Sequence, residues 1–421
     1  MSEWKKVKLG ECITTKKGFA FKSTQYVDKG IPVVRVSDFT QNSISENDLV
    51  YYPISEYDKY FDYILYEKDI LIQTVGSWQY NPNSVVGKVV RVPYYHKGSL
   101  LNQNIVKVIP NDDICKDFVY YRLKCIDFSG FVVGEARGAA NQASITLDTI
   151  KRFSFLLPSY DTQYRIATIL SRYDTLIENY QKQIKLLEEA AQRLYKEWFV
   201  ELRFPGHENT KMVDGLPKGW ERKKLGEVAE FTRGKTITKK EAIEGSIPVV
   251  AGGLEPAYYC DKSNTTNRVI TISGSGANAG YTRMYFEKVW ASDCSFADTS
   301  TTDYLHFVFC FLREHKTVID NMQKGAAQPH VYAKDINALE VLSPTKDILS
   351  LFEQKASKIF DIIASKQSQI RLLTEARDRL LPRLMGGEME VDAPKGQRAI
   401  NPVHRFGHNP QTNHAPKGQK N

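Results

Sequence analysis

Two long stretches of the chain place apolar or bulky residues at alternating steps of four and three positions. The first stretch, 166–198, contains no glycine and no proline. Its apolar series is Ile166, Leu170, Tyr173, Ile177, Tyr180, Ile184, Leu187, Ala191, Leu194 and Trp198. This spacing puts the whole series on one stripe of an α-helix, so the pattern predicts a rod of roughly 50 Å.

The second stretch repeats this pattern with two charged interruptions, Lys366 and Arg377. Its series is Phe352, Ala356, Ile359, Ile363, Ile370, Leu373 and Leu380. We expect Pro382, followed by Gly386 and Gly387, to end this helix. A single apolar stripe is unfavourable in water, so the two helices are predicted to pack as an antiparallel pair. The two charges predict a looser contact between them.

The segments before each long helix are rich in Val, Ile and Tyr and are punctuated by Gly, Pro, Asn and Asp, which is typical of short strands. In the first segment we predict strands at 31–36, 69–74, 84–92 and 104–109, with helices at 118–126 and 147–151. In the second we predict strands at 247–251, 268–272 and 281–286, with a helix at 304–315. Turn-forming residues at 204–220 predict an extended linker, and the tail after 388 is predicted to be disordered.

Motifs recur along the chain in the same order. Trp4-x-x-x-x-Leu9-Gly10-Glu11 recurs as Trp220-x-x-x-x-Leu225-Gly226-Glu227, and Ile31-Pro32-Val33-Val34 recurs as Ile247-Pro248-Val249-Val250, both at an offset of 216 residues. Val75-Gly76-Ser77 matches Ser273-Gly274-Ser275 at 198, Gly138-Ala139-Ala140 matches Gly325-Ala326-Ala327 at 187, and the long helices match at 186. An ordered series of this kind predicts a tandem duplication. A kept framework with different loops is what two readers of different DNA sequences would need.

Composition adds little that is specific. The 421 residues carry a net charge of +8, with five Lys or Arg against one acid from 391 onward, so about half of the excess lies in the tail. That balance is compatible with DNA binding through a local basic face. The 23 tyrosines suit either nucleic-acid stacking or ordinary core packing. The six cysteines form no metal motif, and neither a signal peptide nor an apolar run of membrane length occurs, so we expect a cytoplasmic protein with free thiols.

The combination of features resembles a known family. Phe204-Pro205-Gly206-His207-Glu208, leading to Leu216-Pro217-x-Gly219-Trp220-Glu221, is similar to the junction in specificity subunits of type I restriction–modification enzymes. The resemblance covers nearly the whole chain. It implies an α+β fold of two tandem mixed α/β target-recognition domains, each followed by a long α-helix, with the helices packed as an antiparallel coiled coil of pseudo-twofold symmetry.

The resemblance also implies an organisation and a set of partners. The expected parts are recognition domain 1 (1–160), spacer helix 1 (161–202), a linker (203–216), recognition domain 2 (217–346), spacer helix 2 (347–386) and a basic tail (387–421). Each domain would read one half of a split double-stranded DNA target, and the helices would set the gap. Two methyltransferase subunits and motor–nuclease subunits would use S-adenosylmethionine, ATP and Mg for adenine-N6 methylation and cleavage. This chain itself is expected to bind no cofactor, metal or membrane.

Motifs for catalysis are missing from the sequence. Asn81-Pro82-Asn83 is the nearest fragment to the Asn/Asp-Pro-Pro-aromatic motif of adenine methyltransferases, and no phosphate-binding loop of the motor type occurs. The small-residue run 273–280 lacks the lysine that reaches phosphates. We therefore expect a tight turn there, flanked by strands, in a chain that is not itself an enzyme.

Residues that suit DNA contacts were chosen because their positions correspond between the copies and because their side chains pair with bases or phosphates. In the first copy they are Lys16, Lys17, Ser77, Gln79, Tyr80, Asn81, Asn102, Gln103, Asn104, Arg137, Asn141 and Gln142. In the second copy they are Arg233, Lys235, Ser275, Asn278, Ser292, Asp293, Lys324, Gln328 and His330. Each of them is equally compatible with an ordinary solvated loop.

Three other functions fit parts of the pattern. The chain can be a DNA-binding or scaffold protein of another defence or regulatory system, which would not co-purify with a methyltransferase. It can be an enzyme whose catalytic residues follow no motif recognised above. A purely structural coiled-coil adaptor would show no sequence preference on DNA.

Overall fold

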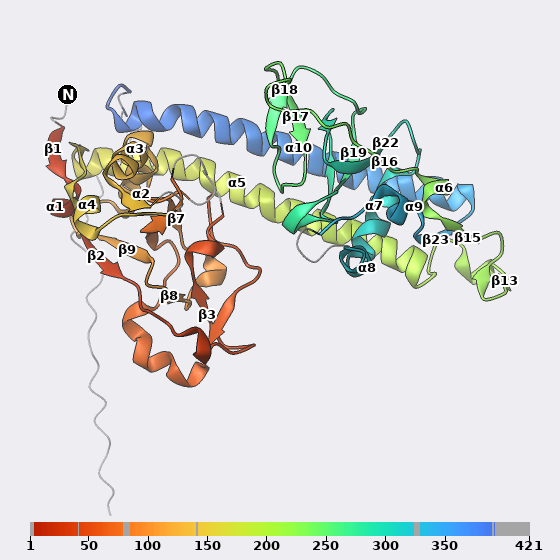
Figure 1. Ribbon diagram of the computed structural model, residues 1–421, viewed down its shortest axis with the longest axis horizontal. Helices are drawn as coiled ribbons and strands as arrows, with labels where there is room; N and C mark the ends of the chain where they lie inside the picture. The colour runs from red at the N-terminus through yellow and green to blue at the C-terminus, as the bar shows by residue number, and fades with distance from the viewer. Residues whose placement is uncertain are drawn as a thin grey trace, which may run out of the picture. The chain divides into compact units, whose positions relative to one another are not determined.

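The computed structural model describes residues 4–40, 42–78, 85–139, 142–323, 329–389 and 391 (Figure 1). The chain forms two compact units, each of which contains part of both long helices. Unit 1 comprises Met1–Thr175 and Glu375–Asn421, and unit 2 comprises Leu176–Thr374.

Unit 1 is a set of small sheets with short helices beside them. One two-stranded sheet pairs β1 (Lys5–Lys8) with β12 (Ser154–Leu157), and a four-stranded sheet has the order β2 (Ile13–Lys17), β9 (Ile105–Pro110), β5 (Ile70–Gln73) and β7 (Val89–Arg91). Two three-stranded sheets have the orders β4 (Val50–Tyr52), β3 (Ile31–Val34), β8 (Leu100–Leu101) and β10 (Arg137–Ala139), β11 (Gln142–Ser144), β6 (Val75–Gly76). Its α-helices before the long one are α1 (Leu9–Cys12), α2 (Lys116–Lys124), α3 (Ile126–Glu135) and α4 (Leu147–Arg152). All of these strand pairs are antiparallel except β3 with β8.

Within the described residues, unit 2 repeats three of these four sheets in the same strand order, and an isolated bridge between Ser275 and His330 stands where β6 pairs with β11. Its strands are paired as β15 (Glu221–Lys224) with β23 (Glu340–Ser343), as β16 (Thr232–Arg233)-β22 (Cys294–Asp298)-β19 (Val269–Ser273)-β20 (Thr282–Tyr285), and as β18 (Tyr258–Cys260)-β17 (Ile247–Val250)-β21 (Trp290–Ala291). Its short helices are α6 (Leu225–Val228), α7 (Leu305–Glu314), α8 (Lys316–Asn321) and α9 (Ala333–Asn337). The lone parallel pair recurs as β17 with β21. The predicted duplication is therefore present at the level of strand order.

The two long helices are α5 (Tyr160–Tyr195), extended by a π-helical turn (Lys196–Val200), and α10 (Lys346–Met385). In unit 1 the start of α5 shares a core with the end of α10, and in unit 2 the end of α5 shares a core with the start of α10. The shared residues are Ile166, Ala167 and Leu170 with Leu381, Leu384 and Met385 in unit 1, and Ala191, Tyr195 and Trp198 with Leu349, Phe352 and Ala356 in unit 2. This antiparallel pairing confirms the prediction from the two apolar series.

The two charged interruptions of the second series have partners on α5, so the predicted loosening was wrong. In unit 1, Nη1 of Arg377 lies 2.7 Å from Oδ1 of Asp174, and both side chains are less than a fifth exposed. The phenol of Tyr121 donates to the same carboxylate at 2.6 Å. In unit 2, Nζ of Lys366 lies 4.7 Å from the ring centre of Tyr180. Each charge therefore adds a specific contact to the helix pair.

Two further expectations also need correction. Pro382 lies inside α10, which ends at Met385, and Gly387 shortly after it takes a left-handed φ of +73°.

The segment predicted as an extended linker contains a hairpin of β13 (Met212–Val213) and β14 (Leu216–Pro217). Phe204 and Trp220 at its ends are buried, with ring centres 4.7 Å apart. Aromatic packing, which the turn-former pattern does not reveal, holds this segment against the core of unit 2.

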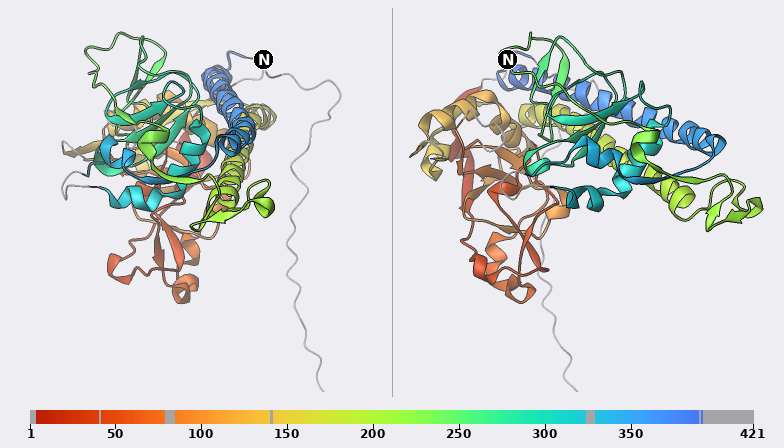
Figure 2. Two further views of the ribbon diagram at one scale, coloured as in Figure 1. Left: turned by 90° about the vertical axis from the view of Figure 1, so that its right-hand side faces the viewer. Right: turned by 45° about the vertical axis from the view of Figure 1, so that its right-hand side comes forward.

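The aromatic residues of unit 1 resolve part of the tyrosine question. Phe19, Phe21, Tyr52 and Tyr60 form a packed cluster with ring centres 4.9 to 5.5 Å apart. The 3₁₀ segment Ile54–Tyr63 that contributes to it lies on the far side of unit 1 from α2 and α3 (Figure 2, orange). Core packing therefore accounts for these tyrosines.

Candidate nucleic-acid interface

Four segments of unit 2 that carry predicted DNA contacts converge. Arg233 ends β16, Ser275 follows β19, and Asp293 lies between β21 and β22. His330 pairs with Ser275 through an isolated antiparallel bridge. Residues that are far apart in the sequence are thus brought to one place by the pairing of β16, β22 and β19.

The Asp293 carboxylate is the centre of this group. The hydroxyl of Ser275 donates to Oδ2, and Nη2 of Arg233 lies 3.7 Å from Oδ1. The backbone carbonyl of Asp293 accepts from the amide of Gly274 at 3.1 Å, which fixes the loop to the end of β19. Because the Arg233 side chain is 71% exposed and that of Asp293 is 36% exposed, both charges are accessible from solvent.

Side-chain hydrogen bonds to the backbone carbonyl of Gly252 hold the turn after β19 in place. Asn278 Nδ2 donates to the carbonyl of Gly252 at 3.3 Å, and the hydroxyl of Ser273 donates to the same carbonyl at 3.2 Å. The turn contains a short 3₁₀ segment, Gly276–Asn278, and connects the antiparallel strands β19 and β20. The expected turn between two strands is confirmed. The amide of Asn278 is already engaged, so only part of its hydrogen-bonding capacity is open.

Other groups at this surface extend the basic and aromatic character. Lys235 is exposed, while its backbone carbonyl accepts from Nε1 of Trp290 at 2.7 Å. The His330 ring stacks on Tyr332, with ring centres 5.9 Å apart, and Nζ of Lys334 lies 5.8 Å from the Tyr332 ring. Sequence reasoning missed Tyr332 and Lys334, because neither belongs to a motif shared by the copies.

Unit 1 brings the corresponding segments together. Lys17 ends β2 opposite Val106, and the amide and the hydroxyl of Thr74 both donate to the carbonyl of Asn104 at 2.9 Å. The β6 strand pairs with β11, and β11 pairs with β10, which places Arg137 and Gln142 next to the loop after Gln73. Arg137, Gln142 and Lys17 are all exposed.

Backbone hydrogen bonds correct the alignment of the two loops. Thr74 donates to the Asn104 carbonyl and accepts from Ile145, whereas Gly274 donates to the Asp293 carbonyl and accepts from Val331. Thr74 therefore matches Gly274 at an offset of 200 residues rather than the 198 inferred from sequence. Asn104 becomes the counterpart of Asp293, and Val75 rather than Ser77 the counterpart of Ser275.

Several predicted contacts have other roles in the structure. Asn102 and Ser292 are 8% and 4% exposed, so burial removes both side chains from the accessible surface. Lys16 pairs with Asp62 at 3.2 Å and lies over the Tyr63 ring. Ser77 forms an isolated bridge with Val85, and Oε1 of Gln103 is buried without a hydrogen-bond partner. Gln79, Tyr80, Asn81, Asn141, Lys324 and Gln328 lie outside the described residues.

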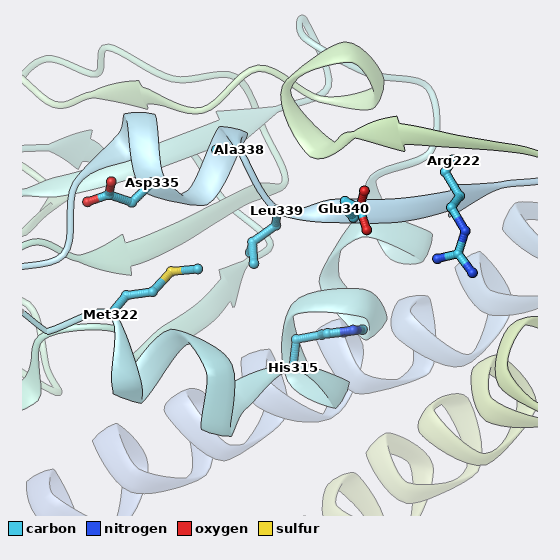
Figure 3. A pocket seen from close by; sticks show the side chains of 7 residues that line it. All are labelled: Arg222, His315, Met322, Asp335, Ala338, Leu339 and Glu340. Atoms are coloured by element: carbon cyan, nitrogen blue, oxygen red, sulfur yellow. The ribbon is translucent and has the colours of Figure 1, made fainter.

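A separate pocket lies elsewhere in unit 2. It has a volume of about 640 Å³ and is lined by Arg222, His315, Met322, Asp335, Ala338, Leu339 and Glu340 (Figure 3). Its walls come from β15, the α7–α8 junction, the α9 region and β23, so it belongs to different elements from the group around Asp293. Within the described ranges, no cluster of His, Cys, Asp and Glu has the makings of a metal site. In the same ranges, no helix is both long and apolar enough to cross a membrane.

The fold and this surface define a protein with two homologous α+β units joined by an antiparallel pair of long helices. The model of the type I restriction modification DNA specificity domain matches residues 1–189 and 217–379. The chain belongs to this family.

Relatives and solved structures agree with this assignment. The chain is 28% identical over 316 residues to the type I restriction enzyme MjaIX specificity subunit of Methanocaldococcus jannaschii, covering 69% of this chain and 73% of the relative. It is 24% identical over 385 residues to a putative MjaX specificity subunit of the same organism, covering 86% and 88%. The crystal structure of an S subunit of a type I restriction–modification system from M. genitalium shares the fold, with a TM-score of 0.54 at 17% identity, over 91% of this chain and 96% of that one.

Proposed function

We propose that this chain is the sequence-specific DNA-binding subunit of a type I restriction–modification complex. Each unit contacts one half of a bipartite double-stranded target, and the chain has no catalytic chemistry of its own. The observation that carries the proposal is the convergence of corresponding segments in both units, with different side chains at matching positions. A shared backbone frame with divergent surface groups suits two readers of two sequences.

The proposal also assigns partners. Two methyltransferase subunits and motor–nuclease subunits would assemble on this chain in the cytoplasm. They would use S-adenosylmethionine for adenine-N6 methylation and ATP with Mg for cleavage. Family membership and the specificity subunits among the relatives support this assignment.

The side chains available at the two surfaces fit DNA chemistry. Arg137, Gln142 and Lys17 in unit 1, and Arg233 and Lys235 in unit 2, are exposed donors beside the converging loops. Arginine and glutamine read guanine and adenine edges, while lysine neutralises phosphates. Lys17 and Arg233 occupy corresponding positions, each one residue before a matching glycine. An adaptor without DNA preference would have no need for exposed donors beside the converging loops of both units.

The test is co-expression of the chain with a type I methyltransferase subunit from the same genome, followed by methylome sequencing. We expect methylation at a split target, and we expect Arg137→Ala to reduce the preference at one half only, by about tenfold. Arg152→Ala is the matched control, because Arg152 is exposed and paired with Glu135 outside the converging segments. Equal loss at both halves, or no co-purified methyltransferase, would contradict the proposal.

A further inference from the structure

The Asp293 carboxylate has an unusual setting for an acidic group on a surface proposed to face DNA. A carboxylate repels phosphates, so its presence there needs a compensating role. Elsewhere in unit 2, a structural carboxylate behaves differently. Asp298 is 2% exposed and accepts hydrogen bonds from the amides of Thr266 and Ser300 and from the Ser300 hydroxyl. Asp293 lacks this enclosure.

Among the residues that the structure describes, the hydrogen-bonding capacity of Asp293 is largely open. An ionised carboxylate offers about four acceptor sites, and the Ser275 hydroxyl uses one of them. Arg233 lies 3.7 Å away, which is too long for a hydrogen bond, so its guanidinium donors point to no fixed partner on Asp293. The Ser275 bond and the Gly274–Asp293 backbone bond hold the carboxylate in place without saturating it.

An open acceptor beside open donors matches one base pair in the major groove. Cytosine presents its N4 amino group as a donor there, and guanine presents O6 and N7 as acceptors. A carboxylate accepts from the cytosine amine, and an arginine donates two hydrogen bonds to guanine. The short separation of Asp293 and Arg233 suits two groups that face the same base pair.

We propose that Asp293 and Arg233 together read one C·G pair in the half-site contacted by unit 2, with Ser275 positioning the carboxylate. The proposal rests on the DNA-binding function proposed above and adds the identity of a base pair. In unit 1 the matching positions carry Asn104, Lys17 and Val75, so the carboxylate, the guanidinium and the positioning hydroxyl are all missing. The half-site of unit 1 is therefore read by different chemistry at the corresponding place.

The test uses the full complex, with base preferences obtained by methylome sequencing and by selection from a randomised duplex pool. Asp293→Asn keeps the shape of the side chain and its bond to Ser275, and we expect it to reduce the preference for cytosine at one position about tenfold. Arg233→Ala should reduce the preference for guanine at the same base pair. Asn104→Asp is the matched control in unit 1, and it should leave the unit 2 half-site unchanged.

The outcomes separate the inference from the proposed function. If the unmodified complex shows no split target, the DNA-binding function fails. If a split target is found but Asp293→Asn, with an unchanged melting temperature, keeps the full cytosine preference, the inference is overturned while the function stands. It is equally overturned if the position that Asp293→Asn affects prefers adenine in the unmodified complex. The same holds if Asp293→Asn and Arg233→Ala alter different base pairs.

Discussion

The two units differ most in length between β3 and β5 of unit 1 and the matching strands β17 and β19 of unit 2. From Val34 to Gln73 in unit 1 the chain takes 39 steps, whereas from Val250 to Ser273 in unit 2 it takes 23. The longer connection of unit 1 contains the 3₁₀ segment Ile54–Tyr63, and Tyr60 of this segment packs against Phe19, Phe21 and Tyr52. Yet the strands on either side keep the same partners in both units. Insertions at a surface connection change what is presented without altering the pairing beneath it.

The side chains that hydrogen-bond the backbone of the two corresponding loops also differ. In unit 1, Gln73 Nε2 donates to the carbonyl of Val75 at 2.9 Å. In unit 2, the matching Ser273 donates instead to the carbonyl of Gly252 at 3.2 Å. Different side chains thus satisfy different backbone carbonyls at the same site, and the backbone frame survives the change.

The largest expected effects compare the cores on which the long helices pack. Ile166 and Phe352 occupy matching positions on α5 and α10, and both are fully buried. We expect Phe352→Ala to destabilise unit 2 by about 3–5 kcal/mol and Ile166→Ala to destabilise unit 1 by about 2–5 kcal/mol. Hydrogen exchange read peptide by peptide should show faster exchange in the unit that carries the change. Faster exchange in the other unit alone would break the comparison.

The two charged interruptions of α10 should differ in energy. Asp174→Ala removes the less exposed carboxylate partner of Arg377, which is left with the more exposed Asp378, and Tyr121 loses its acceptor, at a cost of about 1–3 kcal/mol. Lys366→Met removes only a contact with the Tyr180 ring, at a cost of about 0.5–1 kcal/mol. Denaturant unfolding measures both. Asp174→Ala combined with Arg377→Met should recover most of the loss, and failure to recover would argue against a paired charge.

Two matching glycines provide a smaller effect directed at each loop. A Cβ on Gly18 would lie 2.0 Å from the Asn102 carbonyl oxygen, and one on Gly234 would lie 2.5 Å from the Ala291 and Ser292 carbonyl oxygens. Each Gly→Ala change should therefore shift the adjacent loop, at a cost of about 1–3 kcal/mol. Selected-site sequencing should show a weakened half-site in one unit for Gly18→Ala and in the other for Gly234→Ala. An identical target profile for both variants would show that these loops do not read DNA.

The smallest effect depends on pH. Burial, together with the charges of Arg377 and Lys88, lowers the pKa of Lys124 to about 8. Below pH 8 Lys124 is charged in the folded protein, and burying that charge lowers the stability of the fold by its full amount. Between pH 8 and 10.5 the folded protein loses this proton while the unfolded chain keeps it, so stability rises with pH. Lys124→Met should raise the melting temperature by about 3 °C at pH 7, with a smaller gain at pH 10. Arg313, at the matching position of unit 2, is exposed, so Arg313→Met should change little.

Much of the fold was predictable because its signals are local. The four-and-three spacing of the apolar series from Ile166 to Trp198 indicates a helix directly. The recurrence of the Trp-x-x-x-x-Leu-Gly-Glu motif at Trp4 and Trp220 indicates the duplication. The loops were harder. Short motifs of small residues aligned Ser77 with Ser275, whereas backbone hydrogen bonds align Val75 with it. Small residues recur by chance in turns, so spacing alone does not determine a register there.

Candidate surface residues were predictable by type but not by role. Arg233, Ser275, Asp293 and His330 were all named from sequence, and they meet in the structure. Asn102 and Ser292 had equally suitable chemistry but are buried. The sequence contains no local signal that separates these two sets.

The amino-acid order by itself determined the helical periodicity, the repeated architecture and the kinds of side chain offered to DNA, because each depends on near neighbours or on direct comparison of segments. Only the tertiary structure decided that Arg377 meets Asp174 and that Asp293 lies beside Arg233 with most of its acceptor sites open. These pairs are 203 and 60 residues apart. Contacts at such separations depend on strand register and helix packing, which fix positions in space that no local pattern specifies.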